Sequence, residues 1–211
     1  MTNVFIVSAP SGSGKSTLLR GVFERDKSLV FSISYTTRSP RGQEADGRDY
    51  FFIGRDRFEA EIAAGAFLEW AEVFGNYYGT HRRFLDEAAA AGKDLVLDID
   101  VQGARQLKGK FPEAVSIFIL PPSRQELEQR LRARSEDSDE VIERRLRAAA
   151  GEISRSEDYD YVVVNRDVDE ATDNLAAIFK AERLRRDHKD DEIHRILETF
   201  ESALADESDK D

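Results

Sequence analysis

The chain has no cysteine among its 211 residues. This absence excludes disulfide bonds, thiolate metal sites and cysteine nucleophiles. Long apolar stretches are also missing, since no run approaches the roughly 20 residues that a helix needs to span a bilayer. The first residues, MTNVFIVSAP, lack the basic start and the long apolar segment of a signal peptide. We therefore expect a cytoplasmic protein that makes no contact with a membrane.

Negative charge gathers at the C-terminal end of the chain. The formal net charge is −11, and residues 187–211 carry −7 of it, with ten acidic and three basic side chains. The rest of the chain is nearly balanced. Binding to nucleic acid is not indicated, because that function is typically marked by a basic face. The apolar fraction of 40% is adequate for a buried core.

Four short apolar segments predict buried strands. They are VFIVS at 4–8, LVLDID at 95–100, SIFIL at 116–120 and YVVVN at 161–165. Each has little polar alternation, as expected for parallel strands that are covered on both faces. Helical patterns lie between them, so the sequence predicts an α/β fold with a mostly parallel sheet flanked by helices.

Two regions interrupt this alternation. Residues 31 to about 82 are aromatic, β-rich and broken by glycine, which predicts a small lobe of short strands. Residues 123 to about 156 are helical in pattern and densely charged, and Ser123 with Glu126 suits a capping box. We expect this second region to form a mobile lid, because its middle has few large apolar residues.

We divide the chain accordingly. In the tail, IHRILETFESAL predicts a short amphipathic helix, and the final DESDKD predicts disorder. The predicted parts are a discontinuous core at 1–32, 83–122 and 157–186, a lobe at 33–82, a lid at 123–156 and an acidic tail at 187–211.

The stretch SAPSGSGKST after the first strand predicts a phosphate-binding loop. A glycine-rich turn at a helix N-terminus presents backbone N–H groups to phosphate oxygens. The strict pattern G-x-x-x-x-G-K-[ST] fails at Ala9, but Gly12 and Gly14 remain at the inner turn. We expect Lys15 to reach the β- and γ-phosphates of ATP and the Ser16 hydroxyl to ligate Mg²⁺. The alternative is an ordinary Gly/Ser turn. The predicted ATP-binding residues are Ala9, Pro10, Ser11, Gly12, Ser13, Gly14, Lys15, Ser16 and Thr17.

Two acids close the strand LVLDID. Asp98 and Asp100 are two residues apart, which places them on one face of a strand. Such acids are costly to bury unless they meet a cation or a hydrogen-bonding ligand. We expect a carboxylate here beside the metal; the alternative is that both acids cap the strand and begin the next helix.

The lobe concentrates groups that suit a second phosphate. The segment SYTTRSPRGQEADGRDYFF holds Arg38, Arg41 and Tyr50, and arginine forks with a tyrosine hydroxyl are good phosphate donors. FLEWAEVFGNYYGTH adds Glu69, Tyr78 and Thr80. The alternatives are a solvated hairpin with scattered charge and, for Tyr77 and Tyr78, plain packing aromatics.

Together these stretches resemble the guanylate kinases of the bacterial type. The resemblance runs from Val4 to about Arg186 and includes SAPSGSGKST, TTRSPRGQEADGRDYFF, EVFGNYYGT, LDIDVQGA, IFILPPS and DYVVVN. It implies a P-loop NTPase core, a small mixed α/β lobe that binds GMP, and a helical lid. The implied reaction is transfer of the ATP γ-phosphoryl group to GMP, or also to dGMP, in purine nucleotide metabolism.

The resemblance also implies a role for each matching residue. Those that would hold the GMP phosphate are Arg38, Arg41, Tyr50 and Tyr78. Those that would surround guanine are Ser34, Glu69, Thr80 and Asp100. Asp98 would join Ser16 at the Mg²⁺ site, and Asn165 would contact the adenine side. The implied catalytic residues are Lys15, Arg38, Arg130, Arg134 and Arg145. The last three are arginines of the predicted lid, and the alternative to a catalytic role is that they are solvated surface charges. Arg130 and Arg134 are four residues apart and therefore share one helix face.

The sequence departs from the family at two positions and leaves other functions open. Arg166 follows Asn165 where an acid is common, and His81 follows Thr80 where serine is common. An inactive, protein-binding member of the family and a related sugar-phosphate kinase are the alternative functions. The retained phosphate loop argues against the first, and the complete guanine and monophosphate set argues against the second. A monomer and a homo-oligomer are equally compatible with the sequence.

Overall fold

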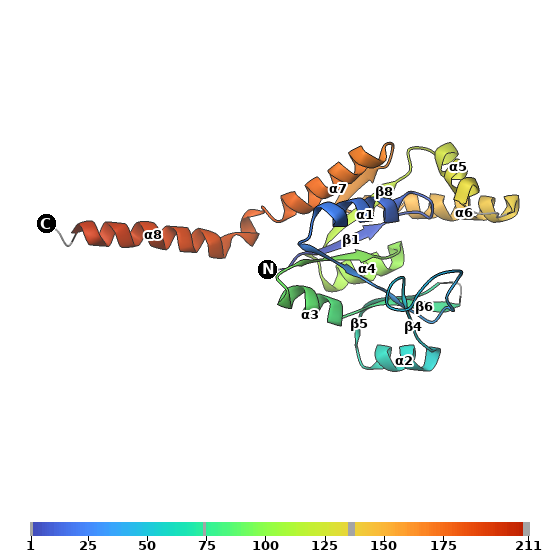
Figure 1. The fold of residues 1–211 in the computed structure, drawn as a ribbon, viewed down its shortest axis with the longest axis horizontal. Coiled ribbons are helices and arrows are strands. Elements are labelled where there is room, and N and C mark those ends of the chain that lie inside the picture. Colours follow the sequence, from blue (N-terminus) through green and yellow to red (C-terminus); the bar gives the residue numbers. More distant parts are fainter. Residues whose placement is uncertain (1, 74, 135–137, 209–211) are drawn as a thin grey trace.

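The computed structural model describes residues 2–73, 75–134 and 138–208. Its centre is a five-stranded sheet with the strand order β2-β7-β1-β8-β9 (Figure 1). The strands are β1 (Val4–Ser8), β2 (Leu29–Ser32), β7 (Asp94–Asp98), β8 (Val115–Leu120) and β9 (Tyr161–Val164). All neighbours in this sheet are parallel. The predicted α/β fold with a parallel sheet is therefore confirmed, and β2 is a strand that we did not predict.

Both faces of the large sheet are covered by helices. Successive residues of β1 point to opposite faces, so Phe5 packs in one apolar cluster and Ile6 in another. The Phe5 cluster includes residues of α1 (Lys15–Arg25) and α7 (Val168–Glu182), and the Ile6 cluster includes residues of α3 (Arg83–Ala90) and α4 (Val101–Lys110). This burial on both sides explains why the central strands are continuous apolar runs.

A second sheet forms within the range predicted for the lobe. It has four strands in the order β4-β3-β6-β5, with parallel and antiparallel pairs. The elements here are β3 (Tyr35–Thr36), β4 (Phe51–Phe52), α2 (Arg55–Ala63), β5 (Phe67–Val73) and β6 (Asn76–His81). Stacked aromatic rings fill its core: the ring of Phe58 lies 4.4 Å from that of Phe67 and 5.2 Å from that of Tyr77.

Two helices, α5 (Arg124–Arg134) and α6 (Asp139–Ile153), lie within the predicted lid. The Glu126 N–H donates to the Ser123 hydroxyl at 3.1 Å, so Ser123 caps α5 through one of the two hydrogen bonds of the predicted capping box. The helices share a small apolar cluster made by Leu127, Leu131, Ile142, Leu146 and Ala149. The mobility of this segment stays a prediction.

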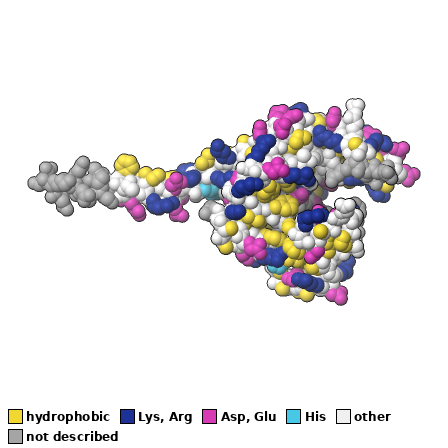
Figure 2. Space-filling model, in the orientation of Figure 1, with side chains coloured by type: hydrophobic (Ala, Val, Ile, Leu, Met, Phe, Trp, Pro, Cys, Tyr) yellow, Lys and Arg dark blue, Asp and Glu magenta, His cyan; other side chains and the backbone are white. Residues whose placement is uncertain are grey.

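The chain ends on a projecting helix. After α7 a short turn, η2 (Arg186–His188), leads into α8 (Asp190–Ser208), which extends away from the rest of the molecule (Figure 1). The predicted tail helix is confirmed. It continues to Ser208, so the prediction of disorder for DESDKD is wrong for its first three residues; the last three lie outside the described part. Apolar side chains lie along one side of α8 (Figure 2), where Phe200 is 65% exposed. Among the described residues, no helix has the length and apolar composition needed to cross a membrane.

Candidate active site

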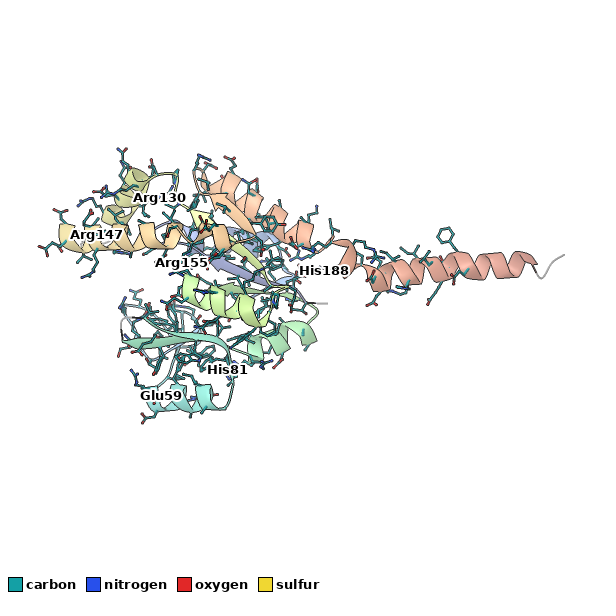
Figure 3. The ribbon with its side chains drawn as sticks, turned by 180° about the vertical axis from the view of Figure 1, so that it is seen from behind. Glu59, His81, Arg130, Arg147, Arg155 and His188 are labelled. Atoms are coloured by element: carbon teal, nitrogen blue, oxygen red, sulfur yellow. The ribbon has the colours of Figure 1, made fainter. Side chains whose placement is uncertain are left out.

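A cleft of about 860 Å³ brings most of the predicted residues together. The large sheet, the second sheet and the lid all contribute to its wall. In Figure 3, Arg130 lies with the lid helices, whereas His81 lies in the lobe on the other side of the molecule. The predicted residues that line the cleft are Ala9, Pro10, Ser11, Gly12, Ser13, Gly14, Lys15, Ser16, Thr17, Ser34, Arg41, Tyr50, Glu69, Tyr78, Asp98, Asp100 and Arg130.

The phosphate loop (residues 9–16) depends on two glycines. Gly12 and Gly14 have φ angles of 90° and 92°, a backbone conformation that residues with a side chain rarely adopt. Gly14 begins α1 without a side-chain cap. The first N–H groups of that helix are therefore available to an anion. Ala9, in place of the usual first glycine, packs against the apolar cluster of the large sheet.

Lys15, the first residue of α1, forms an ion pair with Asp98. Asp98 is the last residue of β7, and β7 lies parallel to β1, which leads into the phosphate loop. Both residues line the cleft together with Ser16. Asp98 thus lies beside the phosphate loop, and its predicted place beside the metal stays a prediction.

Asp100 has a different position from Asp98. Its Oδ1 atom accepts hydrogen bonds from the N–H groups of Gln102 at 3.1 Å and Gly103 at 2.8 Å. For this residue the structure shows the capping role that we gave as the alternative, at the start of α4. Its side chain also lines the cleft, so capping does not remove it from the site.

Glu69 is a buried carboxylic acid at the lobe end of the cleft. Its side chain is only 3% exposed, and on the adjacent strand it faces Thr80, which is fully buried. Burial favours the neutral form and raises the pKa of Glu69 to about 7. A carboxylate held in this place is costly without hydrogen-bond donors, which a ligand can supply.

Arg38 is nearly buried, does not line the cleft and makes several hydrogen bonds. Its guanidinium donates two hydrogen bonds to the Glu44 carboxylate, at 2.9 and 3.1 Å, and a third to the Tyr78 hydroxyl at 3.2 Å. It also lies over the ring of Tyr50, 5.2 Å from the centroid. The hydrogen bond to Glu44 raises the pKa of Arg38, and the same bond lowers the pKa of Glu44.

Glu44 is a residue that our sequence analysis did not single out. Besides the two bonds to Arg38, it accepts a hydrogen bond from the Arg41 N–H at 2.8 Å. It therefore holds together the two arginines that we predicted at the acceptor phosphate. The only signal in the sequence was its place within the quoted motif TTRSPRGQE.

The lid arginines contact the phosphate loop. Arg130 donates to the Ser13 carbonyl of the loop at 3.4 Å and to the neighbouring Asn165 carbonyl at 3.0 Å, and Arg145 donates to the Ser11 hydroxyl at 2.7 Å. Neither is simply a solvated charge. Arg134 is the last residue of α5, and its side chain lies outside the described part of the structure.

Asn165 also contacts the phosphate loop, through a buried hydrogen bond. Its side-chain amide donates to the Ser13 carbonyl at 2.7 Å, and the residue is 2% exposed. A Cβ atom at Gly14 would lie 2.3 Å from this amide nitrogen. Gly14 is therefore needed for close approach as well as for its positive φ angle. The predicted contact of Asn165 with adenine stays a prediction.

Several residues that line the cleft were not predicted from the sequence. The most notable is Glu152 of α6, whose pKa is raised by burial and which feels the opposite charge of Lys15 and the like charge of Asp100. The others are Arg20, Ala71, Val73, Gly79 and Ile99. Tyr77, by contrast, packs between Phe58 and Trp70, so the packing alternative is correct for this ring.

The fold and the cleft define a class of protein: a P-loop phosphotransferase whose cleft extends from the phosphate loop to the second sheet. The guanylate kinase family model matches residues 1–182. The guanylate kinase of Koribacter versatilis (strain Ellin345) is 54% identical over 206 residues, covering 95% of this chain and 88% of that protein. That of Geobacter sulfurreducens is 52% identical over 194 residues, covering 92% and 96%.

A solved structure agrees with these relatives. The crystal structure of guanylate kinase from Anaplasma phagocytophilum matches with a TM-score of 0.71 at 37% identity and covers 88% of each chain. The chain therefore belongs to the guanylate kinase family. Its activity is that of a nucleoside monophosphate kinase, an ATP:GMP phosphotransferase. The family resemblance found in the sequence is thereby confirmed.

Proposed function

We propose that this cleft binds ATP at the phosphate loop and GMP at the lobe, so that the γ-phosphoryl group passes directly between them. The observation that carries this assignment is that Lys15 and Glu69 line one continuous cleft. Holding two substrates in one oriented arrangement is a large part of catalysis in phosphoryl transfer. No covalent intermediate on the protein is needed.

The donor end uses the phosphate loop and its neighbours. The free N–H groups at the start of α1 and the Lys15 ammonium stabilise negative charge on the β- and γ-phosphates. Asp98 and Ser16 are hard oxygen donors of the kind that Mg²⁺ accepts. The described residues contain no cluster of three or more metal-ligating side chains, which suits an ion held partly by substrate phosphates. When bound, Mg²⁺ supplies further charge neutralisation at the phosphates.

The acceptor end separates phosphate binding from base recognition. Arg38, Arg41, Tyr50 and Tyr78 form the donor set for the GMP phosphate. Glu44 orients the Arg38 guanidinium before the substrate arrives, and it holds the backbone N–H of Arg41. Such preorganisation lowers the cost of binding, because fewer side-chain rotations are lost. The dense hydrogen bonding of Arg38 supports this role.

Glu69 is the residue that we assign to guanine. Guanine presents N1–H and its exocyclic N2 amine as two adjacent donors, and one carboxylate can accept from both. Adenine offers an N1 acceptor at the same edge and no amine at C2, so it gives the buried carboxylate neither of the two donors that guanine supplies. Ser34, Thr80 and Asp100 complete this end, and dGMP stays a predicted second acceptor.

The lid completes the site from the ATP side. Arg130 and Arg145 already contact the phosphate loop, and Arg134 ends the same helix as Arg130. We assign them to the charge on the transferring phosphoryl group. Closure of the lid and lobe excludes water, which otherwise accepts the phosphoryl group and wastes ATP.

A coupled assay of ADP formation tests the proposal. The purified chain is supplied with Mg²⁺-ATP and, in turn, GMP, dGMP, AMP, CMP and UMP. Efficient turnover with GMP and a preference over AMP of about 10⁴–10⁵ in kcat/KM are expected from a polar site that rejects a mismatched base. Turnover of AMP equal to that of GMP, or no turnover with any acceptor, would contradict the assignment.

A further inference from the structure

Gly103 lies directly against the carboxylate of Glu69. A Cβ atom built at Gly103 would come 2.6 Å from Glu69 Oε2 and 3.2 Å from Glu69 Cδ. The first of these distances is shorter than any normal contact of a methyl group. Gly103 is in the first turn of α4, where its N–H donates to Asp100. The position therefore connects two of the acids predicted at the base-binding end of the cleft.

The helix α4 is fixed against the strand that carries Glu69. Lys110, near the end of α4, donates to the Leu68 carbonyl at 2.7 Å, and Gln106 Oε1 lies 3.5 Å from the Trp70 N–H. Positions 103, 106 and 110 are spaced to share one face of a helix. The contact at Gly103 thus belongs to a packed interface between α4 and β5. These hydrogen bonds hold the helix against the strand, so the helix cannot move away to make room for a larger side chain.

The backbone does not require glycine at this position. Gly103 lies within a helix and is not among the glycines with a positive φ angle. Glycine in a helix interior is less favourable than alanine. The remaining reason for a glycine at position 103 is that the Glu69 carboxylate occupies the space that a side chain would need.

We propose that Gly103 is a positioning residue for base recognition, because the absence of its side chain keeps the Glu69 carboxylate facing the acceptor base. The inference rests on the proposed role of Glu69. A methyl group at position 103 meets the outer end of the Glu69 side chain, which can rotate, so the carboxylate moves and the fold remains. The positive end of α4 also favours a carboxylate at this place.

The test compares Gly103→Ala with Gly109→Ala. Gly109 is in the same helix, and a Cβ atom there meets nothing within 4 Å. Because alanine is the better helix former, both variants should melt at or above the wild-type temperature. Only Gly103→Ala should raise the KM for GMP, by about tenfold to a hundredfold, as expected for lost hydrogen bonds to a charged group. The KM for ATP should stay within about twofold, because the contact is at the base end.

Discrimination between GMP and IMP isolates the effect on the base. IMP retains N1–H and O6 but has no exocyclic amine at C2. Displacement of Glu69 should therefore lower the GMP-to-IMP ratio of kcat/KM in Gly103→Ala by about tenfold, whereas Gly109→Ala should keep the wild-type ratio. An unchanged ratio in Gly103→Ala, or equal losses for ATP and GMP, would overturn the inference.

A double variant tests the contact itself. Glu69→Asp shortens the side chain by one methylene group and withdraws it from the added methyl. Its effect on the GMP-to-IMP ratio should therefore be less than additive with that of Gly103→Ala, as for residues in contact. Additive effects would contradict the positioning role.

A separate arm distinguishes this inference from the proposed function. If Glu69→Gln leaves the GMP-to-IMP ratio unchanged, Glu69 does not recognise the base, and both proposals fail. If Glu69→Gln lowers the ratio and Gly103→Ala does not, the role of Glu69 stands and only the positioning role of Gly103 fails.

Discussion

Lys15 in the phosphate loop and Asp98 at the end of β7 form an ion pair at the wall of the cleft. The pair joins the residue that we assign to the ATP phosphates with the residue that we assign to Mg²⁺. Each is partly exposed, with 18% and 26% of its side chain accessible. A bound nucleotide can therefore reach both groups without unfolding the loop.

Lys15→Met should nearly abolish turnover while the protein stays folded. The substitution keeps most of the side-chain length but removes the charge that stabilises the transferring phosphoryl group. Loss of one preorganised donor commonly costs about 10²–10³-fold in kcat. Steady-state kinetics, with circular dichroism as a check of folding, measures the effect. Lys180→Met, at an exposed position of α7, is the control and should be neutral. Near-wild-type turnover in Lys15→Met would contradict a catalytic role for Lys15 in the phosphate loop.

Glu44→Gln should weaken GMP binding without affecting ATP. The amide cannot accept two hydrogen bonds from Arg38 and one from Arg41 as the carboxylate does. Loss of charge-assisted bonds of this kind is worth about tenfold or more in binding. The KM for GMP should rise by that factor and the KM for ATP should not change. Glu59→Gln, at an exposed position of α2, is a suitable control. Equal changes in both KM values would indicate a general structural role for Glu44.

Glu69→Gln should reduce the preference for GMP. The variant keeps the side-chain size but places an amide donor where two acceptors are needed. We expect kcat/KM with GMP to fall by about tenfold to a few hundredfold, while activity with AMP changes little or rises. Glu72→Gln, on the same strand with 47% of its side chain exposed, should leave both activities unchanged. A proportional loss with GMP and AMP would make Glu69 a structural residue.

The raised pKa of Glu69 predicts a pH-dependent cost to stability. The folded state holds the Glu69 proton up to about pH 7, whereas the unfolded chain releases it near 4.5. Because the folded state binds more protons in this window, the Glu69 contribution to the free energy of unfolding falls as pH rises from about 4.5 to about 7. Above about pH 7, the ionised Glu69 lowers the free energy of unfolding by a constant amount.

Thermal melting of the wild type and Glu69→Gln checks this prediction. Glutamine is neutral at every pH, so the variant should gain Tm relative to the wild type at pH 8 and lose most of that gain at pH 5. A Tm difference that is the same at both pH values would show that ionisation of Glu69 is not the cause. Glu72→Gln again provides the control, because its side chain is exposed on the same strand.

The parts of the fold that were predicted from sequence are those with a local signal. The central strands are continuous apolar runs because helices cover both of their faces. β2 was missed because it is a four-residue edge strand in which Phe31 is 38% exposed. Its pairing with β7 depends on a segment far along the chain.

The phosphate loop and the acceptor motif were predicted because their residues lie close together in the sequence. Gly12, Gly14 and Lys15 follow one another at the turn between β1 and α1, and the conformation is local to that turn. For Asp100 the sequence left capping and ligand binding open, and the hydrogen bonds to α4 show capping. Glu152 carried no local signal, because α6 brings it to the cleft from a distant part of the chain.

By itself, the sequence determined the phosphate loop, the arginine and tyrosine donors and the alternation of strands with helices, since each depends on neighbouring residues. Only the tertiary structure decided which distant groups meet: Lys15 with Asp98, and Glu69 with Gly103. The pKa of Glu69 near 7 belongs to this second class. It arises from burial, and burial exists only when β5, β6 and α4 pack together and remove water from the carboxylate.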